Sequence, residues 1–191
     1  MSEIDLSPFS DPKDPRKYLR GPFSDDTHTY ATNGHILVRV ARRADVDENE
    51  MTGRTKRVTD LIDKCPNEFV SLAQYTLPDF DMTPRTEMRY CDECGGSGHE
   101  HDCPDCTCEC EACDGEGKYE ETVTPKASIE VLGSNFALNY IKTIWALPNL
   151  TVAISGDALV FRFDGGDGVL MGLNSPYDEH LGSLQLKEAV Q

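Results

Sequence analysis

The chain has 191 residues, of which only 38 % are hydrophobic, and its formal net charge is −16. No run approaches the roughly 18 apolar residues of a membrane-spanning helix, and the first residues lack the apolar stretch of a secretory signal, so we expect a cytoplasmic protein. Clustered cysteines in the reducing cytosol favour metal over disulfides, and the low hydrophobic content indicates that part of the chain is stabilised by something other than an apolar core.

The chain is expected to begin with an extended segment followed by a β-hairpin. Residues 1–26 are rich in Pro, Asp and Ser, which predicts an extended N-terminal segment. Asn33-Gly34 lies between the apolar-rich runs 27–32 and 35–42, and Asn-Gly is the preferred pair of a type I′ turn. These two runs are therefore predicted to pair as antiparallel strands.

A short helix and a short strand are expected next. The helix is predicted from apolar side chains that recur at helical spacing, namely Val58, Leu61, Ile62 and Cys65. Pro66 ends this helix, and the position of Cys65 on it predicts a buried structural thiol. A strand around 69–72 follows.

The chain after residue 117 is expected to complete an α+β fold. A helix is predicted from Ser134 or Asn135, either of which can cap it, to Leu147. Strands are predicted at 128–132, 150–155, 158–163 and 169–173, and the second and third of them form a hairpin. The predicted fold class is thus α+β, with a mostly antiparallel sheet and two helices.

The domain organisation follows from these elements. Residues 27–90 and 118–173 are expected to form the α+β domain, and residues 174–191 a peripheral tail. Residues 91–117 are expected to be a zinc-finger insertion. Its flanks, 86–90 and 118–123, are suited to be antiparallel strands that carry the insertion as an elongated hairpin.

Seven of the eight cysteines lie between residues 91 and 113. The pattern C-x-x-C-x-G-x-G occurs there twice, at 91–98 and at 110–117. A two-residue spacer lets both thiolates of a pair reach one metal ion at about 2.3 Å, and two such pairs complete a tetrahedron. The sequence therefore predicts a structural zinc ion bound by Cys91, Cys94, Cys110 and Cys113.

A third C-x-x-C pair, Cys103 and Cys106, lies between the two repeats. Three interpretations of it stay open. The pair binds a second zinc ion together with Cys108 and a histidine, His99 or His101; it replaces one of the outer pairs at a single ion; or its thiols are free. One zinc ion is expected, and two is the alternative.

The repeated octad resembles the cysteine-rich zinc domain of the DnaJ/Hsp40 chaperones, whose repeats have this form. The resemblance covers 91–117 only, and that family has four repeats and two zinc ions where two complete repeats stand here. It implies zinc ligation by Cys91, Cys94, Cys110 and Cys113 and binding of protein partners. The chain has no His-Pro-Asp motif, so it implies no J domain.

Two stretches outside the cysteine region resemble repeating units of the bacterial DNA polymerase sliding clamp. One is Y-A-T-N-G-H-I-L-V-R-V at 30–40. The other consists of I-E-V at 129–131, the helix through Leu147, L-V-F-R-F-D at 159–164 and G-V-L-M at 168–171. The resemblance implies a clamp-like half-unit interrupted by the zinc finger. It does not imply encircling of DNA, because Lys142 is the only basic residue of the helix predicted at 134–147.

The charge of the insertion decides between classes of partner. Residues 91–117 carry nine acidic side chains and no Lys or Arg. Binding to phosphates depends on Lys and Arg, so direct nucleic-acid binding by the finger is not expected.

The sequence shows no nucleophile–base pair, no phosphate-binding loop and no paired carboxylates of the kind that catalysis uses. We expect a non-catalytic zinc-binding module whose acidic finger engages a protein partner, in an accessory or regulatory protein of phage type. The alternatives are a chaperone-like or thiol-active protein, and a clamp-related replication factor.

Overall fold

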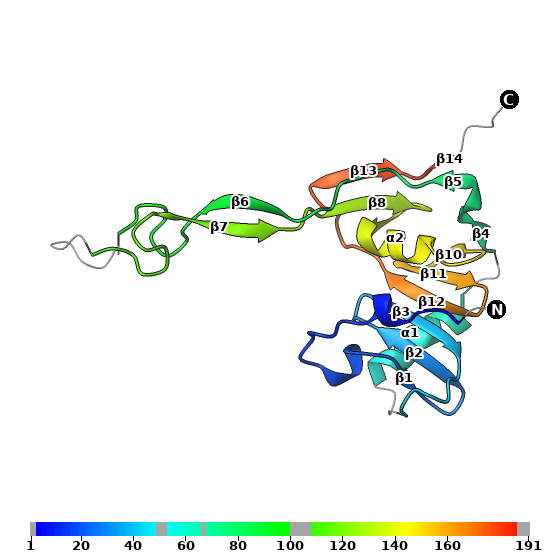
Figure 1. The fold of residues 1–191 in the computed structure, drawn as a ribbon. Coiled ribbons are helices and arrows are strands. Elements are labelled where there is room, and N and C mark those ends of the chain that lie inside the picture. Colours follow the sequence, from blue (N-terminus) through cyan, green and yellow to red (C-terminus); the bar gives the residue numbers. More distant parts are fainter. Residues whose placement is uncertain (1–2, 49–52, 66–67, 100–107, 187–191) are drawn as a thin grey trace. The chain divides into compact units, whose positions relative to one another are not determined.

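The computed structural model describes residues 3–48, 53–65, 68–99 and 108–186. The chain divides into two compact units. We call the first, made of residues 1–79 and 126–191, the body, and the second, residues 80–125, the finger unit. The body contains two helices and mostly antiparallel strands, which confirms the predicted α+β fold class (Figure 1).

The centre of the body is a seven-stranded sheet in which every neighbouring pair is antiparallel. Its strands, in spatial order, are β1 (Phe23–Ser24), β2 (His28–Thr32), β3 (Ile36–Ala41), β12 (Gly166–Met171), β11 (Ala158–Phe163), β10 (Thr151–Ser155) and β4 (Val70–Ser71). Long-range pairing of β3 with β12 joins the two halves of the chain into one sheet.

The β2–β3 hairpin forms where the sequence predicts it, but its turn differs. Thr32 pairs with Leu37, and the N–H of Asn33 donates to the carbonyl of Ile36, so Gly34 and His35 are the central residues. Of the two, only Gly34 has a positive φ, of 92°. Positive φ at the first central residue alone is the pattern of a type II′ turn, so the type I′ prediction is wrong.

A second sheet holds three strands, β13 (Glu179–Ser183), β8 (Ala127–Val131) and β9 (Ser134–Ala137), in that order. The prediction of a helix from residue 134 is wrong here. Leu132 and Gly133 both have positive φ and form a two-residue turn, so the chain folds back and β9 pairs with β8. Helix α2 (Leu138–Trp145) starts only after that strand.

The C-terminal tail takes part in both remaining pairings of the body. β13 lies parallel to β8, and β14 (Gln185–Leu186) pairs with β5 (Tyr75–Thr76). The prediction of a peripheral tail at 174–191 therefore missed the two strands β13 and β14. A parallel partner far away in the sequence leaves no local signal, because its register is set by tertiary contacts.

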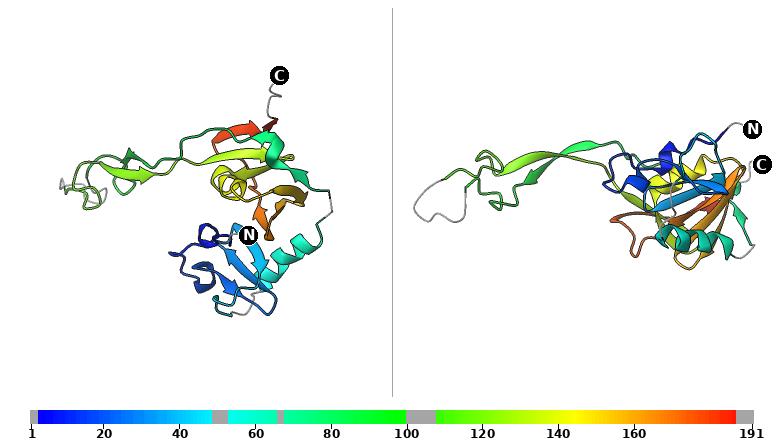
Figure 2. Two further views of the ribbon diagram at one scale, coloured as in Figure 1. Left: turned by 45° about the vertical axis from the view of Figure 1, so that its right-hand side comes forward. Right: turned by 90° about the horizontal axis from the view of Figure 1, so that it is seen from below.

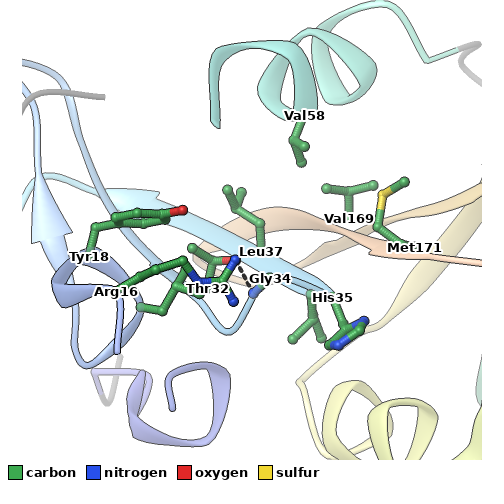
Figure 3. A pocket seen from close by; sticks show the side chains of 11 residues that line it. Arg16, Tyr18, Thr32, Gly34, His35, Leu37, Val58, Val169 and Met171 are labelled. Carbon is green, nitrogen blue, oxygen red and sulfur yellow. Dashed lines mark hydrogen bonds between the residues drawn. The ribbon is translucent and has the colours of Figure 1, made fainter. Parts of the chain in front are cut away.

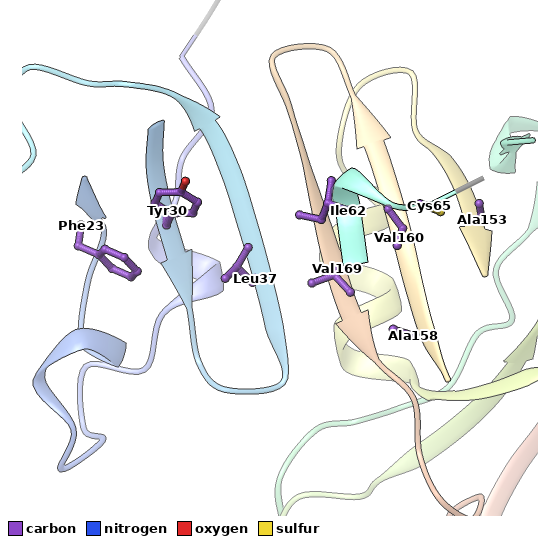
Figure 4. Close-up of a cluster of buried hydrophobic side chains, with 9 residues drawn as sticks. All are labelled: Phe23, Tyr30, Leu37, Ile62, Cys65, Ala153, Ala158, Val160 and Val169. Carbon is purple, nitrogen blue, oxygen red and sulfur yellow. The ribbon is translucent and has the colours of Figure 1, made fainter. Parts of the chain in front are cut away.

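The core packs helix α1 (Gly53–Asp63) against one face of the central sheet. Figure 4 shows Ile62 of this helix over the strands that carry Val160 and Val169. Cys65 belongs to the same buried cluster, as predicted, and burial raises the pKa of its thiol. The opposite face of β11 is buried as well, at Leu159 and Phe161.

The N-terminal segment is packed rather than extended. Its apolar side chains Leu6, Phe9 and Leu19 are all buried, and the chain turns through two short 3-10 helices, η1 (Ser7–Phe9) and η2 (Lys17–Leu19). The side chains of Asp5, Asp11 and Asp14 each accept a hydrogen bond from the backbone N–H two residues further on. The aspartates that suggested an extended chain instead fix its turns.

None of the helices in the described ranges combines the length and apolar character needed to cross a membrane.

Candidate metal centre

An isolated β-ribbon carries the cysteine repeats. Strands β6 (Arg85–Tyr90) and β7 (Lys118–Val123) pair antiparallel over their full length, from Arg85 opposite Val123 to Tyr90 opposite Lys118. The strands predicted at the flanks of the insertion are therefore present (Figure 2). Their last pair brings the start of the first repeat beside the end of the second.

Each repeat folds into the same turn. In the first, the N–H of Gly96 donates to the carbonyl of Cys91 at 3.1 Å. In the second, the N–H of Gly115 donates to the carbonyl of Cys110 at the same distance. The two repeats are offset by 19 residues, and the Sγ atoms of equivalent cysteines lie opposite each other, Cys91 with Cys110 and Cys94 with Cys113, so the pair has approximate two-fold symmetry.

The last glycine of each repeat makes contacts that a side chain would prevent. The N–H groups of Gly98 and Gly117 donate to the Sγ atoms of Cys94 and Cys113 at 3.3 and 3.2 Å. A Cβ atom on Gly98 would lie 2.3 Å from the carbonyl oxygen of Gly115. Both glycines have positive φ, so position and backbone conformation each require glycine.

Two backbone hydrogen bonds tie the repeats to each other. The N–H of Cys91 donates to the carbonyl of Gly117, and the N–H of Cys110 donates to the carbonyl of Gly98, both at 2.9 Å. Each repeat therefore positions the first cysteine of the other. The spacing of cysteines alone does not reveal this exchange.

The four sulfur atoms form a compact cluster. All lie within 4.8 Å of one another, and the Cys91–Cys110 and Cys94–Cys113 Sγ distances are each 3.8 Å. Sulfurs at 2.3 Å from a tetrahedral zinc ion are separated by about 3.8 Å. The cysteines are no more than 7 % exposed. Four buried thiolate donors at this spacing suit zinc, and they leave no coordination position for a substrate.

Hydrogen bonding and burial act in opposite directions on these thiols. Burial raises the pKa of Cys94, but the N–H groups of Gly98 and Gly96 donate to its sulfur and lower the pKa to about 6. At Cys110 burial prevails and raises the pKa to about 12. A divalent cation removes the repulsion that keeps neighbouring thiols protonated, so the full set of thiolates requires a bound metal.

The other cysteines and histidines proposed as ligands do not join this cluster in the described part of the chain. Cys103, Cys106 and His101 lie outside the described residues. The three interpretations of the inner cysteine pair therefore stay predictions. Cys108 and His99 are exposed, and His99 pairs with Glu109 in a single β-bridge.

Sequence reasoning missed two supporting residues, Tyr90 and Glu109. Each precedes the first cysteine of a repeat, and each packs over a glycine of the centre. A Cβ atom on Gly96 would lie 2.8 Å from Cδ1 of Tyr90, and one on Gly115 would lie 3.2 Å from Cγ of Glu109. Both residues directly precede a C-x-x-C pair, and this shared position is the sequence feature from which their role could have been predicted.

Comparison with known proteins adds no relative. No protein-family model matches the chain, and neither a curated protein nor a solved structure matches it. The DnaJ-like and clamp-like resemblances thus gain no support from these comparisons, and the centre is assigned on its donor set and geometry.

Proposed function

We propose that Cys91, Cys94, Cys110 and Cys113 hold one structural zinc ion, and that the finger unit is a non-catalytic module that binds a protein partner. The proposal of a structural zinc ion rests on the four buried sulfurs at tetrahedral spacing. A closed four-cysteine site is the form that structural zinc takes.

A structural role fits this centre better than thiol chemistry does. A reactive cysteine presents its thiolate to solvent or substrate. The pKa of the Cys94 thiol is lowered to about 6, yet its side chain is completely buried. A thiolate that accepts a backbone N–H hydrogen bond but is closed off from solvent suits metal ligation better than attack on a substrate.

The proposed contact surface is one face of the ribbon. Met88 and Tyr90 project from that face and are 58 % and 68 % exposed. Glu120 and Lys118 are directly opposite them on β7, and the Lys118 Nζ atom lies 5.0 Å from the centroid of the Tyr90 ring. Exposed apolar side chains beside charged ones are typical of interaction surfaces.

On the other face of the ribbon, charged side chains form ion pairs with one another. Glu87 pairs with Arg85 at 2.8 Å and with Arg89 at 3.4 Å, and Arg89 also pairs with Glu121 at 3.2 Å. These side chains already have partners. The Met88 face is therefore the better candidate for binding another molecule.

Charge and backbone geometry indicate the kind of partner. Residues 80–125 carry 13 acidic and three basic side chains, a net charge of −10. Among the described residues, β6 and β7 form ladders only with each other, so each keeps one free edge. A free edge accepts an extended strand. The partner we propose is an extended, basic polypeptide segment with apolar side chains on one face.

The zinc half is tested by native mass spectrometry of the purified chain. We expect one zinc per chain, lost in Cys110→Ser. Cys65→Ala, which removes a buried thiol of the body, should keep it. A chain without zinc would refute the assignment, and a second zinc that survives Cys110→Ser would belong to the inner cysteines.

The partner half is tested by fluorescence anisotropy with zinc-loaded protein and a labelled peptide of alternating Lys and Val. Binding should weaken steeply between about 50 and about 200 mM salt, and an alternating Glu and Val peptide should not bind. Met88→Ser should weaken binding about fivefold or more, whereas Tyr119→Ser, on the opposite face, should not. Salt-insensitive binding, or preference for duplex DNA over the peptide, would contradict the proposal.

A further inference from the structure

The body contains a cavity of about 90 Å³ between helix α1 and the central sheet (Figure 3). One water molecule needs only about 10–15 Å³ of such space, so the cavity is large enough for an organic group. In Figure 3, Val58 points from α1 toward Leu37 and Val169. The lining of the cavity includes the apolar side chains of Leu37, Val58 and Val169 and the polar side chains of Arg16 and His35.

The lining divides into an apolar interior and a polar rim. Leu37 and Val169 of the interior are buried, whereas Arg16 and His35 at the rim are exposed. No acidic residue lines this cavity, and the nearest contact with a carboxylate that its rim makes is the pairing of Arg16 with Asp14. An apolar interior with a few polar groups at one side is the usual composition of a small-molecule site, and the bias against carboxylates favours an anionic ligand.

The rim groups are held in fixed positions. Asp14 accepts hydrogen bonds from Nε and Nη2 of Arg16, at 2.9 and 2.8 Å, and Nη1 lies outside this pair. The ring of His35 stacks on that of Tyr140, with 5.6 Å between the centroids. Side chains that are already oriented lose little entropy when they bind a ligand.

Gly34 adjoins two other residues of the lining. A Cβ atom built there would be in van der Waals contact with them, at 3.6 Å from Nη2 of Arg16 and 3.7 Å from Cδ1 of Leu19. The positive φ of Gly34 in the turn favours glycine at this position of the rim.

We propose that this cavity binds a small apolar carboxylate. Its aliphatic or aromatic part would lie between Val58, Leu37 and Val169, and its carboxylate would accept hydrogen bonds from the guanidinium of Arg16 and the imidazole of His35. The site lies in the body and does not depend on the function proposed for the finger unit.

Titration of the zinc-loaded, isotope-labelled protein with hexanoate and with N-acetyl-leucine, followed by amide NMR, tests the proposal. Shifts should concentrate at the lining residues. Tighter binding of hexanoate would indicate a free acid, and tighter binding of N-acetyl-leucine would indicate the C-terminus of a polypeptide. The matching amides, hexanamide and N-acetyl-leucinamide, should bind about tenfold more weakly, because a charged hydrogen bond is lost.

Three variants separate the site from its surroundings. Arg16→Gln should weaken acid binding about tenfold, and Arg16→Lys should restore part of it. Lys17→Gln removes the same charge from the same turn without touching the cavity, and it should bind like the parent. Val58→Phe fills the cavity and should abolish binding while thermal melting shows a folded body. Absence of shifts at the lining residues, equal binding of acid and amide, or full binding by Val58→Phe would each overturn the assignment.

Discussion

At the scale of single residues, Gly117 is, with Gly98, one of two tightly constrained positions of the metal centre. Its φ is 69°, and a Cβ atom there would lie 2.4 Å from the carbonyl oxygen of Gly96. Gly117→Ala should therefore push the two repeats apart and weaken zinc binding. We expect a loss of about 2–4 kcal/mol in zinc binding free energy, measured by competition with a chelator.

Gly133→Ala is the matched control for this prediction. Gly133 also has a positive φ, of 83°, but a Cβ atom there would meet nothing within 4 Å. The substitution should lower the unfolding free energy of the body by about 1 kcal/mol and leave zinc binding unchanged. If both variants bind zinc like the parent, close packing of the repeats does not stabilise the centre.

At the scale of elements, the turn between β1 and β2 depends on one carboxylate. Burial raises the pKa of Asp25, but hydrogen bonds from the N–H groups of Thr27 and His28 and from the Tyr30 hydroxyl outweigh it and lower the pKa to about 2. A carboxylate with a depressed pKa stabilises the folded state above its unfolded value of 3.8, and this stability is lost as the pH falls toward 2.

Asp25→Asn should therefore lower the unfolding free energy at pH 7 by about 1–3 kcal/mol, because hydrogen bonds to a charged acceptor are lost. The difference between parent and variant, measured by urea denaturation, should shrink between pH 4 and pH 2, as the parent loses its charge. Asp26→Asn removes an exposed neighbouring charge and serves as the control. A difference that stays constant with pH would mean that the charge of Asp25 does not stabilise the turn.

The elements also show which parts of the structure the sequence could predict. The hairpin at 28–41, the ribbon of β6 and β7 and the grouping of four cysteines all follow from local spacing and turn residues. β9 and β13 were missed because their strand identity depends on a partner, and β13 pairs with a strand about 50 residues away. Ser134 is of a residue type that often caps helices, but the turn at Leu132 and Gly133 places it in strand β9.

At the scale of the whole molecule, the two units are stabilised by different means. The body has a cluster of buried apolar side chains, whereas the buried cluster of the finger unit consists of its four cysteines. Of the twelve residues in β6 and β7, ten are exposed, only Glu87 and Val123 are partly buried, and none is buried. A two-stranded ribbon with so little burial is marginal on its own, so we expect the proposed zinc ion to supply its folding free energy.

Removal of zinc should therefore unfold one unit and leave the other intact. After treatment with a chelator, hydrogen exchange followed by mass spectrometry should show loss of amide protection in 85–90 and 118–123. Protection in β3, β11 and β12 of the body should stay unchanged, because none of their strand partners lies in the finger unit. Added zinc should restore the ribbon. A ribbon that remains protected without metal would show that β6 and β7 are stable without the cysteine centre, and parallel loss of protection in the body would show that the two units fold as one.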